Sequence, residues 1–258
     1  MLGRRCAGFF SLLHLIALLY LALPATAAEV LTEPAIRAGY IEFPPYSYTD
    51  QRGQAAGDLI ELIKLLAQRN KLQVEFSQYP GFRIFKTLES GQVELWATAY
   101  NHPLLKHALQ SRYRLGLKLN LYYLGNDAPK LPQALRNKRL LLIQGFAYPG
   151  SPLTRYTEDP SYNITTITTP TYEAAVQMLH LKRADYLLHY EGPMEQTTPP
   201  VPAHVTVLEQ DFALTYSKRS PRAQRLRDDF DRTLQQLKDD KQLPESSMGA
   251  LLRVEVRQ

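Results

Sequence analysis

Residues 35–76 decide the fold, and they read AIRAGYIEFPPYSYTDQRGQAAGDLIELIKLLAQRNKLQVEF. The apolar run at 35–41 predicts a β-strand, which ends at a pair of prolines because proline has no N–H to donate to a sheet. Apolar residues recur at helical spacing over 57–71, which predicts an amphipathic helix with a stripe of Leu59, Leu62, Ile63 and Leu66. Residues 72–76 alternate like a second strand. Strand, helix and strand in this order are typical of α/β folds with parallel strands.

The same alternation continues through the first half of the chain. Asp58 is a candidate N-cap for the helix over 57–71. A second helix is predicted from Phe82 to Gly91, since glycine commonly follows the last residue of a helix. Residues 93–100 are mostly apolar, which predicts a strand buried in a parallel sheet.

The second half repeats the pattern. Residues 139–143 and 184–190 are predicted strands. Between them, Thr169 and Pro170 form a good N-cap and N1 pair for a helix that reaches Leu181.

The last predicted helix begins at Ser220-Pro221. Its apolar stripe consists of Leu226, Phe230, Leu234 and Leu237. The Thr/Pro cluster at 197–202 interrupts the strand and helix order, so we expect a hinge or surface loop there.

Residues 1–28 are typical of a secretory signal peptide. Two arginines precede an apolar run at 9–23, which is too short for a membrane core of ~30 Å. Small residues suit cleavage after Ala27 or Ala28. Export to the periplasm follows, and because Cys6 is the single cysteine, the mature chain is expected to carry no disulfide.

Composition excludes several protein classes. The 258 residues are 45% hydrophobic and 21% charged, which argues against a disordered tail, a coiled coil and a polytopic membrane protein. The net charge of +5 falls to +3 once the two arginines of the signal segment are removed. No Lys/Arg run is longer than two, so the sequence gives little support to nucleic-acid binding.

Several segments, taken in order, resemble family 3 periplasmic solute-binding proteins, the amino-acid-type receptors of ABC importers. In the first half the similar segments are 37–39, the aromatic and proline loop 43–48, 57–59 and 88–95. In the second half they are 138–145, 174–190 and 212–218. Each segment alone is degenerate, but their order and spacing make the resemblance specific over most of the mature chain.

The resemblance implies an α/β fold of two lobes, the type II periplasmic-binding fold. Each lobe would hold a mostly parallel sheet flanked by helices, and two crossing segments would join the lobes. Lobe 1 is expected to comprise residues 29–118 and 214–258, and lobe 2 residues 119–213. A ligand that contacts both lobes stabilises the closed form, which a membrane partner then reads.

The residues that grip amino acids in this family are altered here. The family's arginine, which binds the ligand's α-carboxylate, corresponds to Lys106, and the first threonine of that motif corresponds to Asn101. Lysine keeps the charge but loses the two-pronged geometry. The family's carboxylates for the ligand's ammonium correspond to Tyr40 and Tyr190, which carry no charge near neutral pH.

Aromatic residues are expected to form the walls of the cleft. Phe43 occupies the position where the family stacks a ring on its ligand. Other aromatic residues fall in segments predicted to approach the cleft, namely Tyr40, Tyr46, Tyr100, Phe146, Tyr148 and Tyr190. Such walls favour flat or partly apolar solutes. Gln144 and Gly145 end the strand 139–143 and offer side-chain and backbone donors to an anionic group.

The sequence carries no Gly-x-Ser-x-Gly, no phosphate-binding glycine loop and no His-Glu-x-x-His. His102, His107, His180 and His189 lack the spacing of a metal pair, so we expect them on the surface or in loops. The enzymatic alternative is a cyclohexadienyl-type dehydratase on the same scaffold. In it, Glu42 or Glu191 would act as general acid with a raised pKa. In a binding protein, either glutamate could instead replace the family's carboxylates at the ligand's ammonium, if a bulge shifts the strand register.

We therefore interpret the chain as a periplasmic solute-binding protein for a small polar organic solute: an amino acid, a derivative or an organic acid. It would need no cofactor and no metal. Lys106 would neutralise an acidic group of the solute, with Phe43 and Tyr190 as walls. The expected partner is an inner-membrane ABC permease, and the alternative is a sensor that signals to a membrane protein. We expect a monomer that does not bind nucleic acid.

Overall fold

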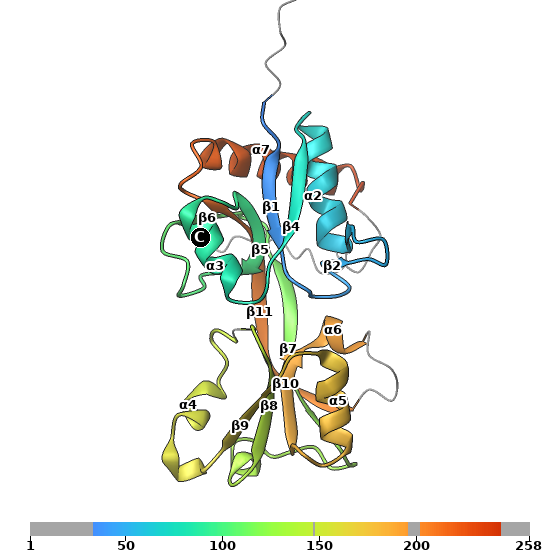
Figure 1. The fold of residues 1–258 in the computed structure, drawn as a ribbon, viewed down its shortest axis with the longest axis vertical. Coiled ribbons are helices and arrows are strands. Elements are labelled where there is room, and N and C mark those ends of the chain that lie inside the picture. Colours follow the sequence, from blue (N-terminus) through green and yellow to red (C-terminus); the bar gives the residue numbers. More distant parts are fainter. Residues whose placement is uncertain (1–32, 147, 196–201, 244–258) are drawn as a thin grey trace, which may run out of the picture. The chain divides into compact units, whose positions relative to one another are not determined.

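The computed structural model describes residues 33–146, 148–195 and 202–243, and nine of its strands form one mixed sheet (Figure 1). Their order is β4-β1-β5-β11-β7-β10-β8-β9, and β6 pairs with β11. The strands are β1 (Ile36–Tyr40), β4 (Val74–Gln78), β5 (Leu95–Ala99), β6 (Ala108–Gln110), β7 (Leu115–Tyr123), β8 (Arg139–Ile143), β9 (Thr165–Thr169), β10 (Tyr186–Tyr190) and β11 (Ala203–Ser217). A separate hairpin consists of β2 (Tyr48–Thr49) and β3 (Ala55–Ala56).

The sheet contains two groups of parallel strands, as the sequence predicts. In the first strand group (β1, β4 and β5), β1 runs parallel to both neighbours. In the second strand group (β8, β9 and β10), β8 runs parallel to both neighbours. The long strands β7 and β11 are antiparallel to each other and join the two groups into one sheet. Their register shifts between Thr206 and Leu208, where the ladder is irregular.

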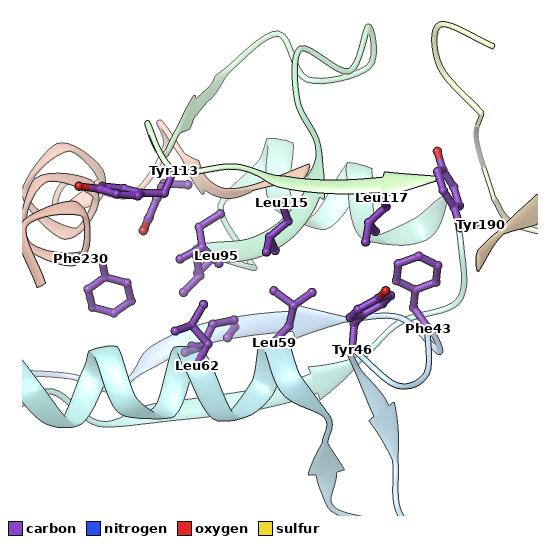
Figure 2. Packing of buried hydrophobic residues seen from close by; sticks show 14 of the residues in the cluster. Phe43, Tyr46, Leu59, Leu62, Leu95, Tyr113, Leu115, Leu117, Tyr190 and Phe230 are labelled. Carbon is purple, nitrogen blue, oxygen red and sulfur yellow. The ribbon is translucent and has the colours of Figure 1, made fainter. Parts of the chain in front are cut away.

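Helices accompany both strand groups. They are α2 (Asp58–Arg69), α3 (Arg83–Ser90), α4 (Thr154–Thr157), α5 (Tyr172–His180), α6 (Glu191–Glu195) and α7 (Ala223–Asp239), with 3-10 turns at Gln133–Leu135 and Pro160–Tyr162. The predicted stripes of α2 and α7 are buried together in one core cluster. Figure 2 shows this cluster extending from Phe230 on α7, past Leu59 and Leu62 on α2, to Phe43 and Tyr190. This core cluster therefore reaches from α7 to the place where the two strand groups meet.

The start of α2 differs from its prediction. Gly57 is the N-cap residue and Asp58 is already helical, so the assignment of Asp58 as N-cap is wrong. The backbone N–H groups of Asp58 and Leu59 donate to the carbonyl oxygens of Pro45 and Tyr46, at 3.1 and 2.8 Å. These carbonyls satisfy donors that a capping side chain would otherwise bind. Gly57 is required because its φ is +111° and a Cβ would lie 2.6 Å from both oxygens.

The start of α5 also differs. Thr169 belongs to β9 and pairs with Ile143, so the predicted cap at Thr169 and Pro170 is wrong. Thr171 is the N-cap instead, and its hydroxyl accepts a hydrogen bond from the N–H of Ala174 at 3.2 Å. The N-cap lies two residues later than predicted, because Thr169 is held in the strand ladder with β8.

Two predictions lie outside the described residues: the signal segment 1–28 and nearly all of the Thr/Pro cluster at 197–202. The lobe boundaries at 118/119 and 213/214 stay a prediction. Within the described part of the chain, every helix is too short or too polar to span a bilayer.

A buried carboxylate attaches α7 to the first strand group. Glu94 precedes β5 and is 3% exposed. It accepts hydrogen bonds from Arg222 at 2.7 Å, from Ser220 at 2.7 Å and from the N–H of Arg37 at 3.2 Å. Burial alone would raise the pKa of Glu94, but the bonds from Arg222, Ser220 and Arg37 outweigh it and lower the pKa from 4.5 to about 2.

We expect Glu94→Gln to lower the free energy of unfolding by about 3 kcal/mol at neutral pH, because Arg222 loses its buried partner. The carboxylate stabilises the fold above its unfolded pKa of 4.5, and this contribution is lost as the pH falls towards 2. The difference between the two proteins should therefore shrink near pH 3. Urea unfolding at about pH 7 and pH 3 measures it, with exposed Glu75→Gln as the matched control. A difference that is the same at both pH values would contradict the charge argument.

Candidate functional site

A cavity of about 910 Å³ lies at the carboxyl ends of two pairs of parallel strands, and we call it the outer cavity. Its lining residues come from segments 41–44, 78–83, 143–146 and 170–173. These segments follow or include the carboxyl ends of β1, β4, β8 and β9. Ligands of open α/β sheets bind outside the carboxyl ends of strands, where loops can vary without disturbing the sheet. The outer cavity is therefore the place where the fold most readily holds a ligand.

Three charged residues line the outer cavity: Glu42, Arg83 and Glu173. Glu42 accepts hydrogen bonds from the N–H and the hydroxyl of Thr49, at 3.1 and 2.7 Å, so its carboxylate is held in place. The side chains of Arg83 and Glu173 have no hydrogen bond or ion pair to another described residue. Arg83 belongs to α3 beside the first strand group, and Glu173 belongs to α5 beside the second. The cavity thus presents opposite charges from its two sides.

A second, smaller cavity of about 40 Å³ adjoins the first, and we call it the inner cavity. Its lining residues are mostly aromatic and apolar: Ile41, Phe43, Gly81, Phe85, Trp96, Thr98, Ala99, His102, Gly145, Phe146, Tyr190 and Phe212. None of these described lining residues is Asp, Glu, Lys or Arg. Ile41, Gly81, Gly145 and Phe146 line both cavities and form the neck between them.

Two glycines determine how closely the loops approach at the neck. A Cβ added to Gly81 would lie 2.4 Å from Cα and 2.6 Å from the carbonyl oxygen of Gly145, both backbone atoms that cannot rotate away. Gly145 also has a φ of +84°, which other residues rarely adopt. Any side chain at Gly81 would therefore push the loop after β4 away from the loop after β8.

Other contacts also cross between the two strand groups. The hydroxyl of Tyr172, on α5, donates to the backbone oxygen of Glu42 at 2.6 Å. A Cβ at Gly192, on α6, would lie 2.4 Å from the ring of Tyr46. These contacts hold the loops of the two groups together. Lys118, on the joining strand β7, also forms an ion pair at 3.5 Å with Glu191 on α6.

A cluster of rings surrounds His189 on β10, which is fully buried. The rings of Phe146, Tyr172 and Tyr190 lie 4.7, 5.1 and 5.8 Å from its ring centre. Phe43, in the loop after β1, contributes an edge contact at 6.4 Å. Figure 2 shows Phe43 lying between Tyr46 and Tyr190, at the end of the core cluster. The aromatic cluster thus combines side chains that follow strands of both groups.

The hydrogen bonds of His189 indicate a neutral imidazole. The hydroxyl of Tyr148 lies 3.0 Å from its Nδ1 and also accepts from the N–H of Ile143 at 3.2 Å. We infer that the phenol hydrogen is donated to Nδ1, which leaves the ring hydrogen on Nε2. Nε2 is buried with no partner among the described residues. Burial lowers the pKa of His189 from 6.5 to about 3.

Four of the seven predicted site residues line the cavities. Phe43 and Tyr190 line the inner cavity, Gln144 lines the outer cavity, and Gly145 lines both. Tyr40, Asn101 and Lys106 line neither. The hydroxyl of buried Tyr40 bonds to the hydroxyl of Thr49 at 3.0 Å.

Asn101 and Lys106 are exposed in the loop after β5. This loop packs along α3, because the ring of His102 lies 4.5 Å from Phe85 and the N–H of His107 donates to Glu89 at 3.0 Å. Its contacts with α3 explain why both side chains lie outside the cavities. Of the two glutamates named for the dehydratase alternative, Glu42 lines the outer cavity and Glu191 lines neither of the two cavities.

Sequence reasoning missed Arg83, Glu173 and the buried histidines. His189 was expected on the surface or in a loop, but it is buried in β10, which lies between β7 and β8. His102 lies in a loop as expected, but its ring is buried against Phe85 of α3. Arg83 and Glu173 each occupy the first turn of a helix that follows a strand. That position, shared by two α/β units, was the signal in the sequence that could have identified them.

Among residues 33–146, 148–195 and 202–243, no three His, Cys, Asp or Glu side chains gather in a way that could hold a metal ion.

Comparisons with known proteins agree on the fold. The family described as bacterial extracellular solute-binding proteins, family 3, matches residues 36–248. A histidine kinase sensor domain with similarity to periplasmic binding proteins aligns at 19% identity and a TM-score of 0.66, covering 86% of this chain and 96% of its own. No curated protein matches the chain in a sequence search.

Two arginine-binding proteins are also similar. An ancestral arginine-binding protein bound to arginine aligns at 19% identity and a TM-score of 0.64, covering 82% of this chain and 96% of its own. An arginine transport periplasmic binding protein from Legionella pneumophila aligns at 13% identity and a TM-score of 0.65, covering 86% and 100%. At these identities the likeness concerns the fold.

We expect His189 to stay uncharged in the folded protein down to about pH 4, so that only the unfolded chain takes up a proton there. Stability should therefore fall as the pH drops below 6.5, by about 2 kcal/mol at pH 5 from this group alone. His189→Gln should remove that part of the acid sensitivity in urea unfolding at about pH 7 and pH 5. Exposed His107→Gln should keep it. An unchanged acid sensitivity in His189→Gln would show that the ring is charged or accessible in the native state.

Proposed function

Because the chain belongs to the bacterial extracellular solute-binding proteins of family 3, we propose that it captures a small dipolar organic solute of the amino-acid type in the outer cavity. The observation that carries this proposal is the pair of unbonded opposite charges, Arg83 and Glu173, on the two sides of one cavity. A solute with a carboxylate and an ammonium complements both. The binding proteins for arginine among the similar structures agree with this ligand class.

The two charges suit different ends of such a solute. The guanidinium of Arg83 offers paired N–H donors, the geometry that a carboxylate prefers. Glu173 and Glu42 accept from an ammonium, and Glu42 is already held by Thr49. In this proposal Arg83, and not Lys106, neutralises the acidic group of the solute. Binding of that group by Lys106 stays the competing proposal. Arg83 and Glu173 make no ion pair with another described residue, so both charges are available to a solute.

Closure would couple binding to a signal. In this proposal the two strand groups belong to the two predicted lobes, and β7 and β11 are the crossing segments between them. The irregular register at Thr206 and Leu208 lies opposite Leu119 and Asn120, at the predicted boundary of the lobes. A ligand held from both sides favours the closed arrangement by its differential affinity for it. The contacts of Tyr172 with Glu42 and of Gly81 with Gly145 would form at the same time.

A membrane protein would recognise and bind the closed form. Import through an ABC permease is the proposed outcome for a periplasmic monomer with a cleaved signal peptide. The similarity to a histidine kinase sensor domain favours a second candidate, a receptor that signals without transport. The genes that neighbour this one distinguish the two, since an importer needs a permease and an ATPase.

We expect a thermal-shift screen of residues 29–258 to find α-amino acids that raise the melting temperature, since a ligand that binds only the folded form stabilises it. Arg83→Gln should weaken the best hit by roughly 10-fold to 100-fold in calorimetry, because a charged hydrogen bond contributes ~1.5 to 3 kcal/mol. Lys86→Gln is the matched control, since it removes the same charge from the same helix outside both cavities. Weaker binding in Lys106→Gln alone would restore Lys106 as the partner of the acidic group.

Turnover of prephenate by the purified protein would replace the binding function by the dehydratase alternative.

We expect Gly81→Ala to weaken the same ligand at least roughly tenfold, because its Cβ would hold the loops at Gly145 apart. Gly81 has no left-handed backbone, so alanine is compatible with its own conformation. Gly116→Ala is the matched control: it also lacks a positive φ, and its Cβ would meet nothing within 4 Å. Small-angle scattering with ligand should show a more extended Gly81→Ala protein. Equal affinity and equal dimensions in both variants would mean that the contact plays no part in closure.

A further inference from the structure

The charges of the site all lie on one side of the neck. Glu42, Arg83 and Glu173 line the outer cavity, whereas no described residue lining the inner cavity carries a charge. We propose that the solute binds with its charged groups in the outer cavity and a short uncharged end, one or two non-hydrogen atoms beyond the neck, in the inner cavity. This inference rests on the proposed function and narrows its substrate class to dipolar solutes with an uncharged tip.

The residues that line the inner cavity explain why it would prefer an uncharged end of the solute to a charged one. Phe43, Phe85, Trp96 and Phe212 present rings, and Ala99 presents a methyl group. A charged end placed there would lose its water and find no opposite charge among the described lining residues, so its desolvation would not be compensated. An uncharged end loses nothing comparable and gains contact with the rings. The charged groups of the solute find their partners in the outer cavity, so only its uncharged end has to enter the inner cavity.

The size of the inner cavity limits the tip. An engineered apolar cavity of about 150 Å³ holds a benzene molecule, which has six non-hydrogen atoms. By the same proportion, about 40 Å³ accommodates one or two such atoms. A ring or a long branched chain would have to separate Gly81 from Gly145 and give up closure. The tip is therefore of the size of a methyl, hydroxymethyl or thiomethyl group.

The two cavities adjoin. Ile41, Gly81, Gly145 and Phe146 belong to the linings of both, so the end of a solute seated against Arg83 or Glu173 has to pass the neck formed by these four residues to enter the inner cavity. Phe43 and Tyr190, predicted as walls of the cleft, then contact the tip, while Gln144 and Gly145 contact the body of the solute.

Isosteric pairs of amino acids test the preference on the unchanged protein. We expect glutamine to bind at least roughly tenfold more tightly than glutamate, and 2-aminoheptanoic acid more tightly than lysine, because the members of each pair match in size and differ in the charge of the end. Calorimetry and thermal shift measure both pairs. Tighter binding of the charged member in both pairs would overturn the proposal.

A cavity-filling variant tests the location. Ala99→Val adds two carbon atoms to the inner cavity, about as many as it holds, and should weaken the uncharged member of each pair roughly tenfold. Ala97→Val, on the same strand but outside both linings, is the matched control and should change neither affinity. If folded Ala99→Val binds the uncharged amino acid of each pair with unchanged affinity, the uncharged end does not bind in the inner cavity.

The outcomes separate this inference from the proposed function. If no amino acid binds, or if binding is independent of Arg83, the proposed function itself fails. If amino acids bind in an Arg83-dependent manner, with no preference for an uncharged end and no effect of Ala99→Val, this inference alone fails. The isosteric pairs need no variant, so the test stands even if Ala99→Val does not fold.

Discussion

The backbones of Gly81 and Gly145 touch, and the arrangement of the site follows from this contact. The two residues belong to loops after β4 and β8, which lie in different strand groups of one sheet. Because neither carries a side chain, the loops approach closely enough to divide the space at the strand ends into an outer, charged cavity and an inner, aromatic one. Bulkier residues would merge the two spaces and separate Phe43 from Phe146, whose ring centres are 5.7 Å apart.

This close arrangement has a cost in unpaired polar groups. Nε2 of His189, the hydroxyl of Tyr190 and the amide oxygen of Asn120 are buried without a partner among the described residues. Each such group costs about 1 to 3 kcal/mol relative to a solvated or bonded one. His189 and Asn120 are paired neighbours on β10 and β7, at the proposed crossing of the lobes.

The strand groups could be predicted from the sequence because their signals are local. The apolar runs 35–41 and 139–143 and the stripes of α2 and α7 need no distant partner to be recognised. The first half of β11 is mostly exposed, and its strand state depends on pairing with β7, so the pattern alone does not indicate it. Residues lining the cavities were predictable where they end a strand, as Gln144 and Gly145 do. Lys106 was placed by counting along a loop whose contacts with α3 direct it elsewhere.

The aromatic replacements in the cleft and the charges at its mouth have one explanation. Tyr190 occupies the position that the family resemblance assigns to a carboxylate, and Phe43, Tyr148 and Phe212 pack against its ring. Burial raises the pKa of Tyr190, so the group is neutral there. A carboxylate in the same place would face rings with no cation among the described lining residues. Under the proposed function, the charged partners of a dipolar solute then lie outside the neck, where Glu42, Arg83 on α3 and Glu173 on α5 are exposed to water.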